Sequence, residues 1–380
     1  MREDNYHPEK SGEIRYSSHG GFSYFWPYDL PFEIELDKKI YKKAETAIIA
    51  LSKLDGKVSQ MTEQERNILL VPFVLMESTK SSAIEGTGTT MEDIYRSERV
   101  EEKDPRKLLD NMEVLNYRDA LNHATGVEGD AIDENLLLDL HRILLKGVRG
   151  ENKSPGSYRE VQVLVGNRGD TLDTAAFVPM PPEEVCWKMR NLFDYINAPY
   201  ENILLSVALS HYQFETIHPF TDGNGRMGRL LIMLILNRSK VLEYPVLCLS
   251  GYFNDKRDDY IRSLNRVREC DDFQGWIDLF LDALIEQSNS SIRLIDSLYR
   301  IRQRFHDMDN DLHTSRLLDS LFINPYVRKT DVARICDVHP STAGKIVNGL
   351  VEKGILLETT GRKRNQLFVC EEIMDVLNSY

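Results

Sequence analysis

Residues 217–231, IHPFTDGNGRMGRLL, hold the side chains best suited to act together in a reaction. His218 titrates near neutral pH, so it could remove a proton from an incoming hydroxyl. Asp222 offers the hard oxygen that Mg²⁺ prefers, and Mg²⁺ is often held jointly with phosphate oxygens. Arg226 and Arg229 lie three residues apart, so on a helix they share a face and suit a di- or triphosphate. Together these groups favour nucleophilic attack on a nucleotide phosphate.

Two glycines lie between the acid and the first arginine of this motif. Gly223 and Gly225 allow positive φ and a close approach of the backbone to a ligand. Free N–H groups at the start of a helix form a cradle for an anion, and the helix dipole reinforces it. Taken singly, a His-Pro pair, a Gly-Asn-Gly turn and an arginine in a first helical turn are usually structural. Their convergence in one short loop is what favours a site.

The motif connects two segments with helical patterns, 201–216 and 229–240. The second segment is apolar on nearly every side, which is typical of a buried central helix. His218 precedes Pro219, and a residue before proline disfavours helix, so the first helix should end just before the motif. We therefore expect the chemical groups on the loop 219–225, at the mouth of a buried helix.

Much of the remaining chain also shows helical periodicity. Residues 1 to about 30 are polar and aperiodic, and we expect them to form an irregular arm. Helical stretches are expected over 37–52, 62–84, 105–148 and 273–305, with LDGKVSQM (54–61) ending the first. Gly86 is a good residue for a helix end, and Thr89 or Thr90 is available to cap the helix that follows.

Residues 160–180 depart from the helical pattern. Val161, Val163 and Val165 alternate as in a strand, and FVPM is the expected return strand, which Pro179 confines to an edge. PPEEV then starts a helix. The sequence thus predicts a small hairpin on an otherwise helical protein.

The C-terminal part has a different character. Three short helical segments, SRLLDSLFINP, KTDVARICD and STAGKIVNGLVEKG, precede two strand-like segments around the basic turn GRKRN. From Arg316 to Val369 there are nine basic and five acidic residues, a local charge of +4. This order is typical of a winged helix-turn-helix, with 341–353 as recognition helix. DNA binding is one interpretation; docking of a protein target is the other, because only Lys345 and Lys353 are cationic on that helix.

The composition limits the classes of function. The 380 residues suffice for two or three domains, and the net charge of −13 argues against nucleic-acid binding over the whole surface. The N-terminal MREDNYHPEK lacks the apolar region of a signal peptide, and the longest apolar run, 68–76, is too short to span a bilayer. Five scattered cysteines argue against zinc and disulfides. We therefore expect a cytoplasmic protein that does not bind membranes.

HPFTDGNGRMGR resembles the Fic-domain signature HPFx(D/E)GNGRxxR at every defined position. The resemblance covers about residues 130–285 and implies a helical core that transfers AMP from ATP to a protein hydroxyl, releasing pyrophosphate. It implies His218 as general base, Asp222 as Mg²⁺ ligand and Phe220 as an anchor of the loop. A related branch that transfers phosphate has a lysine in the glycine loop, where this chain has Gly225 and Arg226, so AMP transfer is favoured.

The same resemblance implies which residues contact ATP. The motif residues are Asp222, Gly223, Asn224, Gly225, Arg226, Met227, Gly228 and Arg229. Of these, Arg226 and Arg229 would hold the β- and γ-phosphates. The family builds its adenine pocket where Tyr252 and Tyr260 lie, although core packing would explain the two tyrosines equally well.

The hairpin 160–180 resembles the Fic flap, which holds a target segment by β-augmentation. Its flap residues would be Phe177, Val178 and Pro179. An ordinary surface hairpin is the alternative.

A further resemblance lies before the expected catalytic core. SSAIEG, residues 81–86, resembles the Fic inhibitory motif (S/T)xxxE(G/N). Ser81 and Glu85 share a helical face, and Glu85 lies just before Gly86, where the helix dipole disfavours a carboxylate. Arg229 is the natural cation to relieve this, so we expect Glu85 to withdraw it from the γ-phosphate. A surface glutamate at a frayed helix end is the alternative; Glu85 could also help to remove AMP from a modified target.

The sequence therefore predicts a mainly α protein of three parts. These are an N-terminal helical region with the inhibitory helix (1–125), a Fic catalytic domain with a small β-hairpin flap (130–285), and a linker helix with a winged helix-turn-helix (290–380). The expected activity is that of a Mg²⁺- and ATP-dependent adenylyltransferase acting on a Ser, Thr or Tyr hydroxyl of a target or of itself. The alternative is a DNA-binding or adaptor regulator with a secondary Fic activity. The target, a homodimer and the dominant direction of the reaction stay open.

Overall fold

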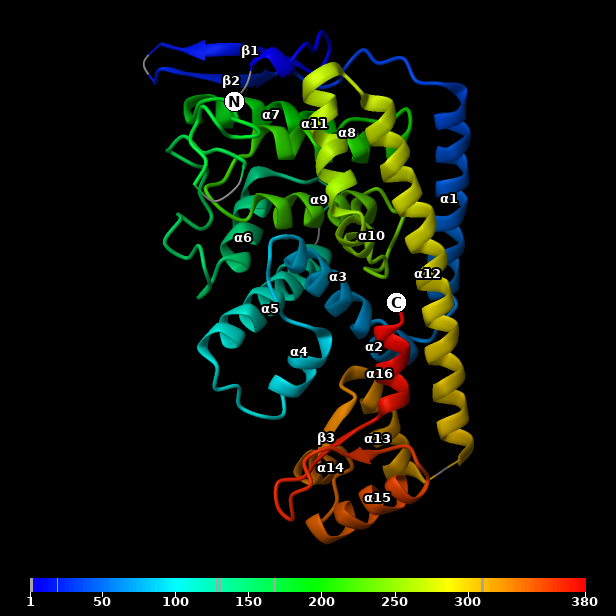
Figure 1. The fold of residues 1–380 in the computed structure, drawn as a ribbon. Coiled ribbons are helices and arrows are strands. Elements are labelled where there is room, and N and C mark those ends of the chain that lie inside the picture. The colour runs from blue at the N-terminus through cyan, green and yellow to red at the C-terminus, as the bar shows by residue number, and fades with distance from the viewer. Residues whose placement is uncertain (1–2, 19, 128, 130, 167–168, 309–310) are drawn as a thin grey trace.

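The computed structural model describes residues 3–18, 20–127, 129, 131–166, 169–308 and 311–380. The protein is mainly helical, as the sequence predicts, with two small antiparallel sheets among the described residues. A helical core lies between an N-terminal hairpin and a C-terminal module drawn in orange and red, and two long helices run along one side (Figure 1). The expected boundary near 125–130 falls partly on residues 128 and 130, which lie outside the described residues.

The helices and strands have the following bounds. The helices are η1 (Glu3–Asn5), α1 (Lys38–Ser59), α2 (Glu63–Leu69), α3 (Val71–Ile84), α4 (Met91–Ser97), α5 (Pro105–Gly126), α6 (Glu134–Leu144), η2 (Pro182–Glu184), α7 (Val185–Ile196), α8 (Ile203–Ile217), α9 (Asn224–Arg238), α10 (Leu249–Asp255), α11 (Arg257–Cys270), α12 (Phe273–Met308), α13 (Leu312–Ile323), α14 (Lys329–Ile335), α15 (Pro340–Glu352) and α16 (Glu371–Asn378). The strands are β1 (Gly12–Ser17), β2 (Phe22–Pro27), β3 (Tyr326–Arg328), β4 (Leu357–Glu358) and β5 (Leu367–Val369).

The N-terminal arm is not irregular, so that expectation was wrong. β1 and β2 form an antiparallel hairpin in which Gly12 faces Pro27 and Ser17 faces Phe22. Phe25 of β2 is fully buried, and its N–H donates to the carbonyl of Val178 at 3.0 Å. The arm is therefore held by partners far along the chain, which a periodicity argument cannot see.

The two long helices, α1 and α12, lie side by side (Figure 1). The sequence wrongly ended the first helix at 54–61; α1 instead continues through Gly56 to Ser59. Leu54 and Val58 are fully buried and extend the stripe of Ala47 and Leu51. Burial of this stripe outweighs the cost of about 1 kcal/mol that glycine imposes on a helix interior.

The segment expected as one helix over 62–84 is two helices, α2 and α3. Pro72 lies in the first turn of α3, where the absence of its N–H costs no helical hydrogen bond. In a continuous helix through 62–84 the same proline would remove a hydrogen bond, so the chain forms two helices instead. α3 ends before Gly86, which has φ 94°, as expected. Thr90 caps α4 and forms a capping box with Asp93.

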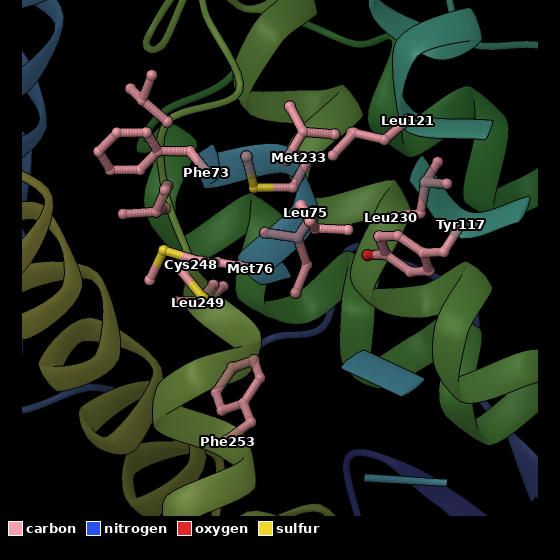
Figure 2. Close-up of a cluster of buried hydrophobic side chains, with 14 of the residues drawn as sticks. Phe73, Leu75, Met76, Tyr117, Leu121, Leu230, Met233, Cys248, Leu249 and Phe253 are labelled. Carbon is pink, nitrogen blue, oxygen red and sulfur yellow. The ribbon is translucent and has the colours of Figure 1, made fainter. Parts of the chain in front are cut away.

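The helical core is built around α9. The expected stretch 105–148 is two helices, α5 and α6, and α9 begins at Asn224, earlier than the expected 229. α9 is buried on nearly all sides, as predicted for the central helix. Figure 2 shows its Leu230 and Met233 packed among apolar side chains of α3, α5 and α10. This shared core holds the N-terminal helices rigidly against the motif helix.

The expected hairpin over 160–180 is only partly formed. Val165 and Phe177 make one antiparallel bridge, and no strand covers the described residues 160–166. Residues 167–168, in the turn, lie outside the described residues. Pro179 bridges Phe25 in parallel, so the second side of FVPM is covered by the N-terminal arm rather than forming a free edge.

The C-terminal module has the order expected of a winged helix. α13, β3, α14 and α15 are followed by β4 and β5, and the sheet order is β3-β5-β4. The sequence missed the three-residue β3 and the final helix α16. The module docks on α4: Asn324 donates to the carbonyl of Tyr95 at 3.0 Å, and the Tyr326 hydroxyl to Glu92 at 2.9 Å.

None of the helices in the described part of the chain is long and apolar enough to cross a membrane.

Candidate active site

The motif loop joins the end of α8 to the start of α9. His218 is the C-cap residue of α8 and has left-handed backbone angles (φ 51°, ψ 60°). Gly223, which precedes α9, has φ 80°. A non-glycine residue in this region costs about 1–3 kcal/mol and persists only when its surroundings hold it. The backbone of His218 is therefore held by contacts outside the loop.

The imidazole of His218 is oriented by the helix that precedes it. Nδ1 lies 3.3 Å from the carbonyl oxygen of Glu215, which can only accept, so Nδ1 carries the proton and Nε2 is left with a free lone pair. Burial lowers the pKa of His218 to about 4, and the Arg159 and Arg268 cations act in the same direction. At neutral pH the imidazole is thus an unprotonated base.

Two side chains fix the shape of the loop. Asn224 accepts from the N–H of Phe220 and donates to its carbonyl, both at 2.8 Å. The Phe220 ring stacks on His141, with ring centroids 3.7 Å apart. His141 in turn places Nε2 3.0 Å from the carbonyl of Asp222. Phe220 therefore anchors the loop, and the Asn224 side chain is used within the loop, which leaves its backbone N–H for an anion.

A cavity of about 230 Å³ opens beside the start of α9. Its lining residues are Glu85, Glu113, Arg149, Asp222, Gly223 and Arg226. Arg226 is only 5% exposed, and its Nε and Nη1 have no hydrogen-bond partner among the described residues. Because unpaired buried guanidinium nitrogens are costly, they mark the position where an anion would bind.

Arg229 is turned away from this cavity and towards α3. Nε donates to Oγ of Ser81 at 2.8 Å, and Nη2 donates to the Ser81 carbonyl at 2.9 Å and to Oε1 of Glu85 at 2.7 Å. Burial would raise the pKa of Glu85, but the Arg229 cation outweighs it and the pKa lies below its usual value. The ion pair expected from the sequence is present.

Asp222 is the residue best placed to hold a metal ion. Its carboxylate faces the cavity and approaches Arg226 Nη2 at 3.6 Å. The described residues contain no cluster of three metal-ligating side chains. One carboxylate beside an anion seat still fits Mg²⁺, which is commonly bound through one or two carboxylates plus substrate phosphates and water.

Other residues expected to bind ATP lie differently. Met227 is fully buried in the core, and a Cβ at Gly228 would overlap Oε1 of Glu215. Tyr252 and Tyr260 are 5% and 3% exposed and do not line the cavity. They pack with Phe253, and the Tyr260 hydroxyl lies 2.8 Å from Nε2 of His211.

The flap segment lies between two partners. Phe177 exchanges backbone hydrogen bonds of 2.8 and 3.0 Å with Val165 on one side. On the other side the N-terminal arm binds Val178 and Pro179 through Phe25.

Five site residues were missed by sequence reasoning. Glu113 and Arg149 line the cavity and form an ion pair. His141, Arg159 and Glu215 contact the loop from α6, the segment before the flap, and α8. Glu215 is buried next to Arg229, and burial raises the pKa of Glu215 to about 7. Sequence patterns single out these residues poorly: His141 lies among apolar residues of a helix, but Arg159 lies between Tyr158 and Glu160 in a polar segment.

The chain was compared with known proteins. A Fic/DOC family model matches residues 131–236, and a Fic/DOC family N-terminal model matches residues 41–126. Protein adenylyltransferase Fic from Nematostella vectensis is 31% identical over 198 residues, 50% of this chain and 42% of that protein. Protein adenylyltransferase fic-1 from Caenorhabditis elegans is 34% identical over 115 residues, 30% of this chain and 20% of that protein. The chain thus spans less than half the length of these curated relatives.

Solved structures support the same fold. A Fic family protein from Desulfovibrio desulfuricans G20 superposes with a TM-score of 0.58 at 23% identity, covering 90% of this chain and 98% of that one. A fragment of Fic-1 from C. elegans superposes with a TM-score of 0.54 at 20% identity, covering 68% of this chain and 74% of that one. At these identities the likeness shows the fold alone. The two family models together match about half of this chain, which belongs to the Fic/DOC family.

Proposed function

We infer that the protein is a Mg²⁺- and ATP-dependent adenylyltransferase that transfers AMP to a Ser, Thr or Tyr hydroxyl of a target protein or of itself. The observation that carries this is the cavity at the start of α9. There, buried and unpaired nitrogens of Arg226 lie beside the Asp222 carboxylate, in the same loop as the neutral base His218. The curated relatives are named protein adenylyltransferases, which supports the same activity.

The groups have complementary tasks in such a transfer. The target hydroxyl oxygen forms a bond to the α-phosphorus, and Nε2 of His218 takes the hydroxyl proton. The bond from the α-phosphorus to its bridging oxygen breaks, and pyrophosphate leaves. Arg226 and the N–H groups at the start of α9 stabilise the charge on the departing phosphates. When bound at Asp222, Mg²⁺ would neutralise part of the same charge.

The contacts of Glu85 support an autoinhibited resting state. Arg229 donates its Nε and Nη2 hydrogens to Ser81 and Glu85, so these hydrogens are not available to a γ-phosphate. A triphosphate without this contact is poorly aligned for in-line attack, and alignment is a large part of phosphoryl-transfer catalysis. The same carboxylate, facing the cavity, could orient a water molecule for removal of AMP from a modified target.

The target segment would pair with the outer edge of residues 161–164. The other side of Val178 and Pro179 is already covered by Phe25. Val161 is 56% exposed, which supports access of a partner to this segment; a partner strand would have to displace the Gln162 side chain from the Val163 carbonyl. The five free cysteines support a reducing cytoplasm as the place where this occurs.

The transfer is tested with ATP labelled in either the α- or the γ-phosphate, incubated with the protein, Mg²⁺ and a cell lysate. The Glu85→Gly variant is used beside the unmodified protein, so that the restraint does not hide the activity. Label from α-labelled ATP should appear in protein bands, and label from γ-labelled ATP should not. Transfer from γ-labelled ATP alone would overturn the assignment in favour of phosphate transfer.

The second candidate function is DNA binding by the winged helix. Ser341, Thr342, Lys345 and Asn348 are exposed on α15, where a recognition helix reads bases. Arg362, Lys363 and Arg364 are exposed in the turn between β4 and β5 and have no ion-pair partner in the described part of the chain. A free basic wing beside a polar helix face favours this candidate over a purely structural module.

A further inference from the structure

Arg159 is a buried arginine that binds the backbone of the catalytic loop. The residue is 2% exposed, and Nε donates to the carbonyl of His218 at 2.9 Å. Its Nη2 donates to the carbonyl of Met180 at 2.6 Å, and its own N–H donates to the carbonyl of Pro219 at 2.9 Å. A longer contact of 3.4 Å reaches the carbonyl of Ile217. One side chain thus joins the end of α8 to Met180, the last residue of the expected flap hairpin 160–180.

No carboxylate is among the hydrogen-bond partners of Arg159 in the described residues. Buried cations are normally paired with acids. Here the carbonyls at the C-terminus of α8 take that role, because a helix C-terminus carries partial negative charge and unsatisfied carbonyl oxygens. Burial lowers the pKa of Arg159 to about 10, so the side chain stays charged at neutral pH.

Arg159 contacts the part of the loop whose backbone conformation is least favourable. His218 has left-handed backbone angles, which a non-glycine residue keeps only under outside constraint. Within the loop, Asn224 fixes Phe220 but does not contact His218. The Arg159 side chain binds the carbonyl of His218 and its backbone N–H binds the carbonyl of Pro219, so Arg159 contacts the peptide units on both sides of Pro219 and restrains the backbone that carries the imidazole.

We propose that Arg159 is a positioning residue that locks His218 in its catalytic backbone conformation and fixes the distance from His218 to the target-binding flap. This rests on the proposed transferase function. The planar guanidinium reaches the His218 and Met180 carbonyls at once, which a single lysine ammonium matches poorly. The Arg159 side chain would thus align the flap that binds the target with the His218 base, before the target hydroxyl reaches that base.

Two substitutions test this in the Glu85→Gly protein, with self-labelling by α-labelled ATP as the assay. Arg159→Met should lower the maximal labelling rate about 10²-fold, the loss typical of a displacement of about 1 Å, without changing the half-saturating ATP concentration. Arg159→Lys should recover part of the rate. Lys188→Met is the matched control, because Lys188 is a 2% exposed cation that binds Asp29 instead of the loop; its rate should not change.

A second readout does not depend on transfer. In protein with ¹⁵N-labelled histidine at pH 7, His218 should show separate signals for a protonated Nδ1 and an unprotonated Nε2, assigned by their loss in His218→Ala. Arg159→Met should move both signals towards a tautomer average, and Lys188→Met should not. If Arg159→Met does not fold, Arg159→Lys carries both tests.

The outcomes separate the two proposals. Unchanged signals or an unchanged rate in a folded Arg159→Met protein overturns the positioning role. If the Glu85→Gly protein itself transfers no AMP, the proposed function fails, while the ¹⁵N signals still decide whether Arg159 holds His218.

Discussion

Arg229 and Glu85 form an asymmetric ion pair: the guanidinium is 2% exposed and the carboxylate 42% exposed, with Nη2 and Oε1 2.7 Å apart. The carboxylate can return to water, whereas the cation stays buried and needs a replacement anion. A γ-phosphate is such an anion, so the proposed restraint predicts that ATP replaces Glu85 on Arg229.

Removing the carboxylate should therefore activate the enzyme. Glu85→Gly frees Arg229 for the γ-phosphate, and labelling from α-labelled ATP should rise about 10-fold or more, in line with the kinetic effect of aligning a phosphate. Glu85→Gln keeps the size but weakens the pair, and an intermediate rise is expected. Arg229→Ala is the control, because it also breaks the pair but removes the phosphate ligand, so labelling should not rise. Unchanged labelling in a folded Glu85→Gly protein would show that the restraint lies elsewhere.

Loss of the base should separate binding from chemistry. His218→Ala removes the proton acceptor, which typically costs about 10²- to 10⁴-fold in rate. Calorimetry should show nearly unchanged ATP affinity, because His218 acts on the target hydroxyl. Asp222→Ala and chelation of Mg²⁺ should also stop transfer, but both should weaken ATP binding. Loss of ATP affinity in His218→Ala would contradict the assigned role.

Two helical glycines should respond in opposite ways to alanine. A Cβ at Gly228 would overlap Oε1 of Glu215, and overpacking of a core typically costs about 1–3 kcal/mol. A Cβ at Gly56 of α1 meets nothing within 4 Å, and alanine there should stabilise by about 0.5–1 kcal/mol. Urea unfolding of both variants measures the difference. Equal stability changes would contradict the placement of Glu215.

Stability should fall as the solution becomes acidic. Burial lowers the pKa of His141 and His218 to about 4 and that of His211 to about 3. Below about pH 6.5 these histidines are therefore protonated in the unfolded chain but not in the folded protein, which destabilises the folded protein. Glu215 opposes them, because its folded pKa of about 7 favours the folded state as pH falls towards 4.5, and buried Glu77, whose pKa burial also raises, acts in the same direction. Three histidines outweigh two carboxyls, so the loss of stability is on the order of 1–3 kcal/mol per pH unit between about pH 6 and 5.

Unfolding in urea at several pH values measures this slope. His211→Gln should lower the slope by about one proton's worth, about 1.4 kcal/mol per pH unit, and His123→Gln, at an exposed position, should leave it unchanged. A flat stability profile in this range would mean that the histidines are not held neutral.

The wing should make any DNA binding salt-dependent. Each phosphate contact adds about 0.9 to the slope of log affinity against log salt, so replacing Arg362, Lys363 and Arg364 by alanine should lower that slope by about 2–3. Replacing Lys38, Lys39 and Lys42, which are exposed on α1, removes the same charge elsewhere and should have little effect. Absence of any salt-sensitive binding to mixed duplexes would leave protein docking as the role of the module.

Features set by local chemistry were predictable from the sequence. The Thr90 cap, the end of α3 at Gly86 and the buried α9 follow from residue types within a few positions. The pairing of Glu85 with Arg229 could be expected because both belong to recognisable motifs with opposite charge.

Features set by distant partners were not predictable. The N-terminal hairpin is held by Val178, and Arg159 finds its carbonyl partners 21 and 59 residues away. No periodicity or spacing records such contacts. They exist only after α8 and the flap segment have been brought together.

Helix α12 connects the helical core to the C-terminal module. Near its start, Trp276 donates to the carbonyl of Ala208 in α8, and near its end Phe305 packs on Phe322 of α13. Its 36 residues give a length of about 54 Å. The module has a second attachment, because Asn324 and Tyr326 bind Tyr95 and Glu92 of α4. A movement of the C-terminal module would therefore be transmitted to α4, which follows α3, the helix whose C-cap residue is Glu85.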